Sequence, residues 1–158
     1  MVIRRMRDTE DDYALMIRWR NSPHVRYWWD PDLPPLTLES AREEYLADTL
    51  PDPDTTACIV ELAGEPVGFM QFYRWSSYAD EAEEIGIEFD GATAGVDVFV
   101  GEPDLAGQGL GTRMMNLLCG YLETERDASS VVLTTELTNE AAIRCYEKAG
   151  FKKAGQIL

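Results

Sequence analysis

Three glycines in five residues, Gly107, Gly109 and Gly111, follow a strand-like stretch and precede a helix-like one. Glycines at such a junction leave backbone N–H groups uncovered, and the start of a helix adds a partial positive charge. Together these features favour the binding of a phosphate or pyrophosphate group. Glycine also serves ordinary turns, so the loop by itself leaves both interpretations open.

A carboxylate lies within the strand-like stretch that precedes this loop. Val96, Val98 and Val100 alternate to one face of the predicted strand, so Asp97 shares the other face with Phe99. A carboxylate is costly to bury without a partner, so Asp97 is expected to face a cleft, a partner or solvent.

Near the C-terminus, Asn139 and Tyr146 are seven residues apart in a predicted helix and therefore share one of its faces. The amide can bind a ligand and the phenol can donate a proton. The alternative is an N-cap and a packed aromatic side chain. His24, the only histidine, lies in a turn beside Pro23 and is expected to be structural rather than a catalytic base.

The composition excludes several classes of function. With 14 Lys and Arg against 29 Asp and Glu, the net charge is −15, which repels nucleic acid and anionic lipid but attracts a cationic small molecule. The same acidity also serves solubility. No apolar run is long enough to span a membrane, and charges break up the N-terminal segment that a secretion signal would need. Three scattered cysteines without a CxxC pair predict neither disulfides nor zinc, and fit a reducing cytoplasm.

The periodicity of the chain predicts the elements that position these residues. Strands are predicted over residues 2–6, 57–62, 66–73, 95–100 and 131–135, with a further strand from Phe151. Helices are predicted from Thr9 to Asn21, over 37–49 with Thr37 as cap, after the glycine loop, and over 139–149 with Gly150 just past its end. The acidic residues 75–92 predict a surface loop. The helix after the loop carries one apolar face, made by Leu110, Met114, Leu117, Leu118, Tyr121 and Leu122.

This order predicts one α/β domain over residues 1–158 with a single mixed sheet. Two of its motifs, Gln108-Gly109-Leu110-Gly111 and the stretch from Asn139 to Phe151 that contains Tyr-Glu-Lys-Ala-Gly-Phe, resemble the GNAT superfamily of acyl-CoA N-acyltransferases. Within the superfamily the chain resembles the aminoglycoside 6′-N-acetyltransferases. Further segments carry that likeness, namely Trp28-Trp29, Gly64-Glu65-Pro66-Val67-Gly68 and Gly95-Val96-Asp97.

The resemblance implies a GNAT fold, in which a mixed central sheet is flanked by helices and two strands splay apart at the acetyl-CoA site. In that fold, backbone groups of the glycine loop hold the pyrophosphate, and the edge of the strand before it pairs with the pantetheine arm like an added strand. Asn139 is then expected to bond the pantetheine. The implied cofactor-binding residues are Val98, Phe99, Val100, Gly107, Gln108, Gly109, Gly111, Thr112, Asn139, Ala142 and Tyr146.

The acceptor implied by the resemblance is a cationic amine, namely the 6′-amine of an aminoglycoside. Acidic residues between 80 and 90 are expected either to line its site or to form a solvated loop. The tryptophan pair is expected either to contact the sugar or to plug the core. The implied substrate-binding residues are Trp28, Trp29, Tyr45, Gln71, Tyr73, Asp80, Asp97 and Glu136.

The resemblance also implies direct attack of the amine on the thioester in a ternary complex, without a metal. Tyr146 is the expected acid, the N–H of Val98 the expected donor to the carbonyl oxygen, and Asp97 either the base or an anchor for the ammonium group. An acyltransferase for a hydroxylysine-type siderophore precursor or for a protein N-terminus is the enzymatic alternative. A non-catalytic acyl-CoA-binding module is the other. The expected assembly is a monomer or a homodimer.

The chain departs from the family pattern at two positions and at its end. Ala106 stands where the glycine loop usually begins with Gln or Arg. Thr134 stands where relatives carry an Asp that holds the cationic drug, and Glu136 is the nearest carboxylate that would replace it. The family pattern continues beyond Leu158 with a further strand. We therefore expect that strand to lie outside this chain or to come from a neighbouring molecule.

Overall fold

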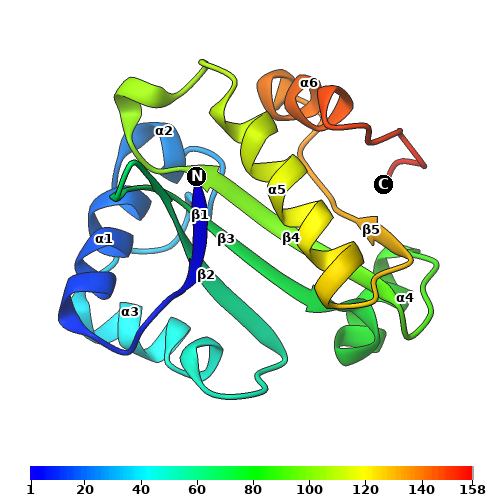
Figure 1. Cartoon of the computed structure of the whole chain (residues 1–158), viewed down its shortest axis with the longest axis horizontal. Coiled ribbons are helices and arrows are strands. Elements are labelled where there is room, and N and C mark those ends of the chain that lie inside the picture. Colours follow the sequence, from blue (N-terminus) through cyan, green and yellow to red (C-terminus); the bar gives the residue numbers. More distant parts are fainter. Residues whose placement is uncertain (158) are drawn as a thin grey trace.

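The computed structural model describes residues 1–157, and these fold around one five-stranded sheet (Figure 1). The strands are β1 (Val2–Arg5), β2 (Thr55–Leu62), β3 (Glu65–Arg74), β4 (Thr93–Val100) and β5 (Ser130–Val132), and they lie in sequence order across the sheet. The first three pairings are antiparallel and the β4–β5 pairing is parallel. The predicted mixed sheet of an α/β chain is therefore confirmed.

Helices cover both faces of the sheet, because side chains alternate along the strands and both faces are apolar. On one face, α1 (Glu10–Arg20), α2 (Pro23–Arg26) and α3 (Leu38–Tyr45) pack against residues such as Ile59 and Phe69. On the other face, α5 (Leu110–Glu125) packs against Met70 and Val96, with residues of α6 (Glu140–Lys148) at the margin (Figure 1).

Local sequence explains where the helices begin and end. Thr9 caps α1 by accepting the N–H of Asp12, and Thr37 and Ser40 form a capping box at the start of α3. The cap at Thr37 and the helix start at Thr9 were both predicted. After α6, Gly150 adopts a left-handed φ of 97°, which glycine takes without a steric penalty. Of the six residues predicted to form the apolar face of α5, Leu110, Met114, Leu118 and Leu122 are buried and Tyr121 is half-buried, but Leu117 is exposed.

Three sequence predictions about the elements were wrong. Residues 75–92 are not an irregular loop, because they form a short 3-10 helix (Trp75–Tyr78) and then α4 (Ala79–Ile85). Here the alternation of alanines and acids permits a helix, and Ala82 anchors it by full burial. The strand predicted over 131–135 is only three residues long. No strand begins at Phe151 within the residues that the structure describes.

The close approach of Trp19 to β4 makes a first prediction. A Cβ at Gly101 would lie 2.3 Å from the Trp19 ring, which is fully buried. We expect Gly101→Ala to lower the free energy of unfolding by about 1–3 kcal/mol, because the core there has no room to expand. Gly120→Ala on α5, where a Cβ meets nothing within 4 Å, is the control, and it is expected to be stabilising. Urea denaturation of both variants measures the difference.

Candidate active site

The sheet opens between its last two strands. β4 pairs with β5 only through Thr93, Ala94 and Gly95, so no β5 residue pairs with β4 from residue 96 onward in the described chain. We call the space beside residues 96–100 the β4–β5 gap. Because the N–H of Gly101 donates to Val67 on β3, and such bonds alternate along a strand, Val98 and Val100 turn their backbone polar groups toward the gap. The splayed strands implied by the resemblance are therefore present.

At one end of this gap, His24 has the structural role that the sequence predicted. Its Nε2 lies 3.0 Å from the carbonyl oxygen of Val100, to which it donates from α2. The backbone groups of Val98 and the N–H of Val100 remain for a ligand. Phe99 differs, because the same alternation turns its backbone toward β3. Of the three predicted edge residues, Val98 and Val100 therefore have the geometry to pair with an added strand.

The glycine loop lies directly beyond this edge and has an open backbone. Gly107 and Gly109 have φ values of 75° and 80°, and residues 106–109 are exposed. Gly109 is the N-cap residue of α5, so the first N–H groups of that helix have no intrahelical acceptor. A Cβ at Gly111 would lie 3.1 Å from the Cys145 sulfur, so α5 and α6 are close at this point. Such a loop fits the phosphates of a nucleotide cofactor, with Gln108 and Thr112 flanking the N-cap residue.

The start of α6 confirms the capping alternative for Asn139, whose side-chain oxygen accepts the N–H of Ala142 at 3.2 Å. Capping uses that oxygen and leaves the amide N–H₂ as the group for a ligand. On the same helix, Tyr146 is half-buried and packs edge-on against Phe151. Burial, with the charges of Cys145 and Asp97, raises the pKa of Tyr146 to about 12, so the phenol keeps its proton at neutral pH.

Asp97 and Gln71 face each other across β4 and β3. The Gln71 Nε2 donates to Asp97 Oδ2 at 2.9 Å. Burial, helped by the charge of Glu81, raises the pKa of Asp97 above its usual range, against the opposing effect of the Gln71 hydrogen bond. Beside this pair, the ring of Tyr73 packs over Gly95, where a Cβ would lie only 2.2 Å away. The predicted Gln71, Tyr73 and Asp97 are thus brought together on one face of the sheet.

An aromatic cluster continues the same face beyond Asp97. Phe69 and Phe99 stack at 5.3 Å, and Trp29 meets them edge-on at 6.0 and 5.2 Å. Tyr45 also meets Phe69 edge-on, but it is only 1% exposed. In this structure Tyr45 therefore supports the cluster from within and presents no surface to a ligand.

The other predicted substrate residues are dispersed. Trp28 is exposed and packs edge-on against the exposed Tyr27. Asp80 and Glu136 are exposed, the first on α4 and the second in the segment between β5 and α6. Sequence reasoning missed Tyr78, which the 3-10 helix before α4 brings edge-on against the ring of Tyr73. Glu81, one of the acidic residues expected to line the site, lies in the first turn of α4, where its charge acts on Asp97. A helical interpretation of residues 75–85 would have indicated this placement.

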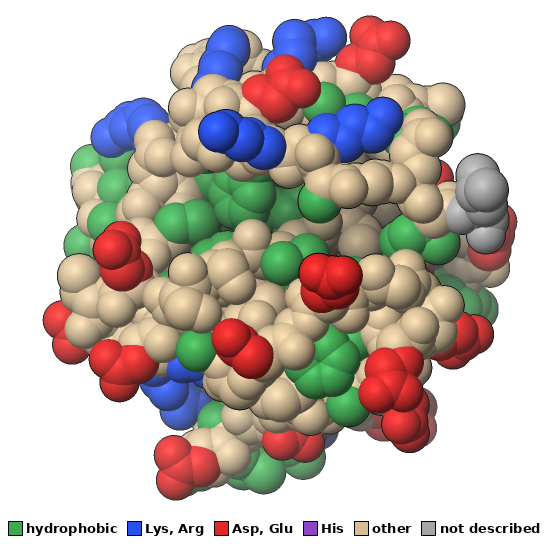
Figure 2. Space-filling view, turned by 90° about the vertical axis from the view of Figure 1, so that its right-hand side faces the viewer, with side chains coloured by type: hydrophobic (Ala, Val, Ile, Leu, Met, Phe, Trp, Pro, Cys, Tyr) green, Lys and Arg blue, Asp and Glu red, His purple; other side chains and the backbone are tan. Residues whose placement is uncertain are grey.

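Charge is divided across the face that contains β5 and the end of the chain. Figure 2 shows a hollow with apolar side chains in its depth, Lys and Arg along its upper rim, and Asp and Glu below it. All three lysines, Lys148, Lys152 and Lys153, belong to α6 or the segment after it. Among the described residues, no three His, Cys, Asp or Glu are grouped as a metal site requires. None of the described helices is long and apolar enough to cross a membrane.

Comparison with known proteins agrees with this geometry. Residues 8–158 match the model of an acetyltransferase (GNAT) domain. The chain is 33% identical over 149 residues to aminoglycoside N(6′)-acetyltransferase type 1 of Klebsiella pneumoniae, covering 94% of this chain and 73% of the relative. It is 30% identical over 130 residues to a mycothiol acetyltransferase of Propionibacterium freudenreichii, covering 81% of this chain and 37% of that one.

Among solved structures, that of AAC(6′)-Ib in complex with coenzyme A and kanamycin superposes with a TM-score of 0.84 and 34% identity, covering 98% of this chain and 85% of that one. The complex of AAC(6′)-Ib with ribostamycin and coenzyme A gives a TM-score of 0.86 at the same identity, covering 98% and 84%. The domain match, the long alignment and the splayed sheet agree. The chain belongs to the GNAT family of acetyltransferases.

Proposed function

We propose that this protein transfers the acetyl group of acetyl-CoA to the 6′-amine of an aminoglycoside, through a single catalytic domain over residues 1–158. The observation that carries the proposal is the half-buried Gln71–Asp97 pair beside the open edge of β4. This arrangement places the Asp97 carboxylate, which can receive a proton, next to the free edge of β4, which can bind an acyl donor. The Klebsiella pneumoniae relative and the two AAC(6′)-Ib structures named above are aminoglycoside acetyltransferases, which supports this choice of acceptor.

The cofactor side is formed by the gap and the glycine loop. Val98 and Val100 would pair with the pantetheine arm, and the backbone from Gly107 to Thr112 would hold the pyrophosphate. Bound acetyl-CoA supplies an activated acetyl group as a thioester. The lysines at the end of α6 add positive charge on this side of an otherwise acidic molecule.

Three groups of the protein act on the reaction. Asp97 receives a proton from the attacking amine, and the hydrogen bond from Gln71 fixes one of its oxygens while the other stays available. The N–H of Val98 donates to the carbonyl oxygen as that oxygen gains negative charge. Tyr146, whose phenol is protonated at neutral pH, donates its proton to the departing sulfur.

The acidic side of the molecule fits a polycationic acceptor. Asp80 and Glu81 lie in the first turn of α4, and the charge of Glu81 reaches Asp97 and Tyr73. These carboxylates take over the attraction that the Asp missing at Thr134 would supply. Trp29 and the aromatic rings behind it offer an apolar surface to a sugar ring.

A thiol-release assay with acetyl-CoA tests the proposed function. We expect saturable turnover with kanamycin and tobramycin and none with a matched drug that has a 6′-hydroxyl in place of the amine. Hydroxylysine derivatives and a peptide panel serve as the alternative acceptors. Turnover only with one of those panels would refute the aminoglycoside assignment. Binding of acetyl-CoA without turnover of any amine would indicate a binding module instead.

A further inference from the structure

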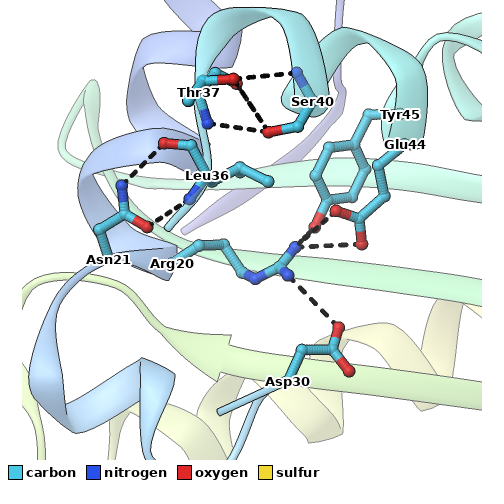
Figure 3. Close-up of polar contacts among 8 residues, drawn as sticks. All are labelled: Arg20, Asn21, Asp30, Leu36, Thr37, Ser40, Glu44 and Tyr45. Atoms are coloured by element: carbon cyan, nitrogen blue, oxygen red, sulfur yellow. Dashed lines mark hydrogen bonds and ion pairs between the residues drawn. The ribbon is translucent and has the colours of Figure 1, made fainter. Parts of the chain in front are cut away.

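The segment 27–36 carries the tryptophan pair and has no regular secondary structure between α2 and α3. Two residues at the end of α1 hold it (Figure 3). Asn21 fixes its far end, because its side chain donates to the carbonyl of Leu36 and accepts the N–H of the same residue, at 2.9 and 2.8 Å. The segment is therefore tied to α1 just before the capping box of α3.

Arg20 holds the near end from inside the molecule. It is only 6% exposed, and its Nη2 pairs with Asp30 at 3.3 Å. Its Nη1 donates to both oxygens of Glu44, each at 3.1 Å, and to the hydroxyl of Tyr45 (Figure 3). One planar guanidinium group thus links the segment to two neighbouring side chains at the end of α3.

The same side chain lies against the aromatic cluster. The guanidinium carbon is 5.8 Å from the centre of the Trp29 ring and 5.9 Å from that of Tyr45. Asp30, the residue that follows Trp29, has a φ of 51°, which is unfavourable for a residue with a side chain unless other contacts hold it. The ion pair with Arg20 is such a contact.

We propose that Arg20 is a positioning residue that sets the place of Trp29 against Phe69 and Phe99, and so acts on the acceptor without touching it. This proposal rests on the proposed function. Loss of the guanidinium fork would leave the segment in the binding-competent arrangement for only part of the time. Apparent affinity falls in proportion to that fraction. The cofactor side is built from β4, α5 and α6, whereas the hydrogen bonds, ion pairs and cation–π contacts of the Arg20 side chain within the described residues go to Trp29, Asp30, Glu44 and Tyr45.

Steady-state kinetics of Arg20→Met and Arg20→Lys test this proposal. We expect Arg20→Met to raise KM for kanamycin by about tenfold, the change expected if a tenth of the molecules are competent. The value of kcat and the KM for acetyl-CoA should not change. Arg20→Lys, which keeps the charge but loses the fork, should raise the acceptor KM by a smaller factor. Arg42→Met on α3, which removes an exposed Arg that lies over Tyr13, is the matched control.

Hydrogen exchange of the amides of residues 27–36 gives a second readout that needs no acceptor. We expect faster exchange in both Arg20 variants and unchanged exchange in Arg42→Met. Equal changes in the KM of both substrates, or a lower acceptor KM in Arg20→Met, would overturn the proposal. If the native chain acetylates no aminoglycoside, the proposed function fails by itself. In that case hydrogen exchange alone tests the positioning role of Arg20. Unchanged exchange of the amides of residues 27–36 in Arg20→Lys would rule out that role.

Discussion

Replacement of Asp97 by Asn is expected to lower kcat/KM for the acceptor by about 10²–10⁴-fold, because the amide cannot receive the proton of the attacking amine. Asn keeps the shape of the side chain and can still accept from Gln71, so the fold and the cofactor side are preserved. Thiol release at saturating acetyl-CoA measures the loss. An anchor role for Asp97 predicts a different result, in which KM for the acceptor rises and kcat is kept.

The pH dependence separates these two roles further. Because burial raises the pKa of Asp97, the native enzyme should lose kcat/KM as the pH falls through a value above the usual Asp range. Asp97→Asn should lack this acidic limb in whatever activity remains. If kcat/KM fell at the same acidic pH in the native enzyme and in Asp97→Asn, the titrating group would be a residue other than Asp97.

The same substitution should stabilise the fold at neutral pH. A raised pKa means that the folded protein binds the Asp97 proton more tightly than the unfolded chain does. The stability that this bound proton contributes is complete when the pH is below the pKa of Asp97 in the unfolded chain. It is lost as the pH rises through the pKa of Asp97 in the folded protein. Asn has no charge to bury, so its Tm should exceed that of the native protein at pH ~7 but not at pH ~3. Asp54→Asn, which changes another exposed carboxylate, serves as the control.

Tyr146→Phe is expected to lower kcat by at least about 10²-fold, because the departing sulfur loses its proton donor. The ring stays in place against Phe151, so titration with coenzyme A should give an unchanged Kd. Tyr121→Phe is the matched control. Tyr121 lies on α5, and its hydroxyl accepts a hydrogen bond from Arg126, the C-cap residue of that helix. Full activity of Tyr146→Phe would assign the proton donation to a water molecule or to another side chain.

Much of the fold follows from local sequence. Period-two alternation placed Asp97 and Phe99 on the face opposite Val96 and Val98, and the structure confirms this, because the valines pack toward α5 and Phe99 packs toward α1. The helix start at Thr9 and the cap at Thr37 were also predicted, because a helix N-terminus depends on residues only three positions apart.

Contacts between distant segments were not predictable in this way. Tyr45 was predicted to contact the acceptor, yet its buried hydroxyl accepts a hydrogen bond from Arg20, twenty-five residues earlier in the chain. The pairing of β5 with β4 ends at Gly95 and Val132, although the residues of this stretch predicted a strand as far as residue 135. Glu81 could be predicted only as one of several acidic residues near the acceptor, because an acidic run does not indicate which of its carboxylates lies near Asp97.

Unpaired strand edges usually invite other chains to add to a sheet and so promote aggregation. Here the unpaired edge lies inside the sheet, since β4 and β5 are already joined at one end of it. An intruding polypeptide would find room for only a few residues and would meet the junction at Gly95. A narrow ligand without bulky side groups can bind along the short free edge of residues 96–100 and does not have to extend past Gly95. The open edge can therefore persist on a folded protein without the usual danger of self-association.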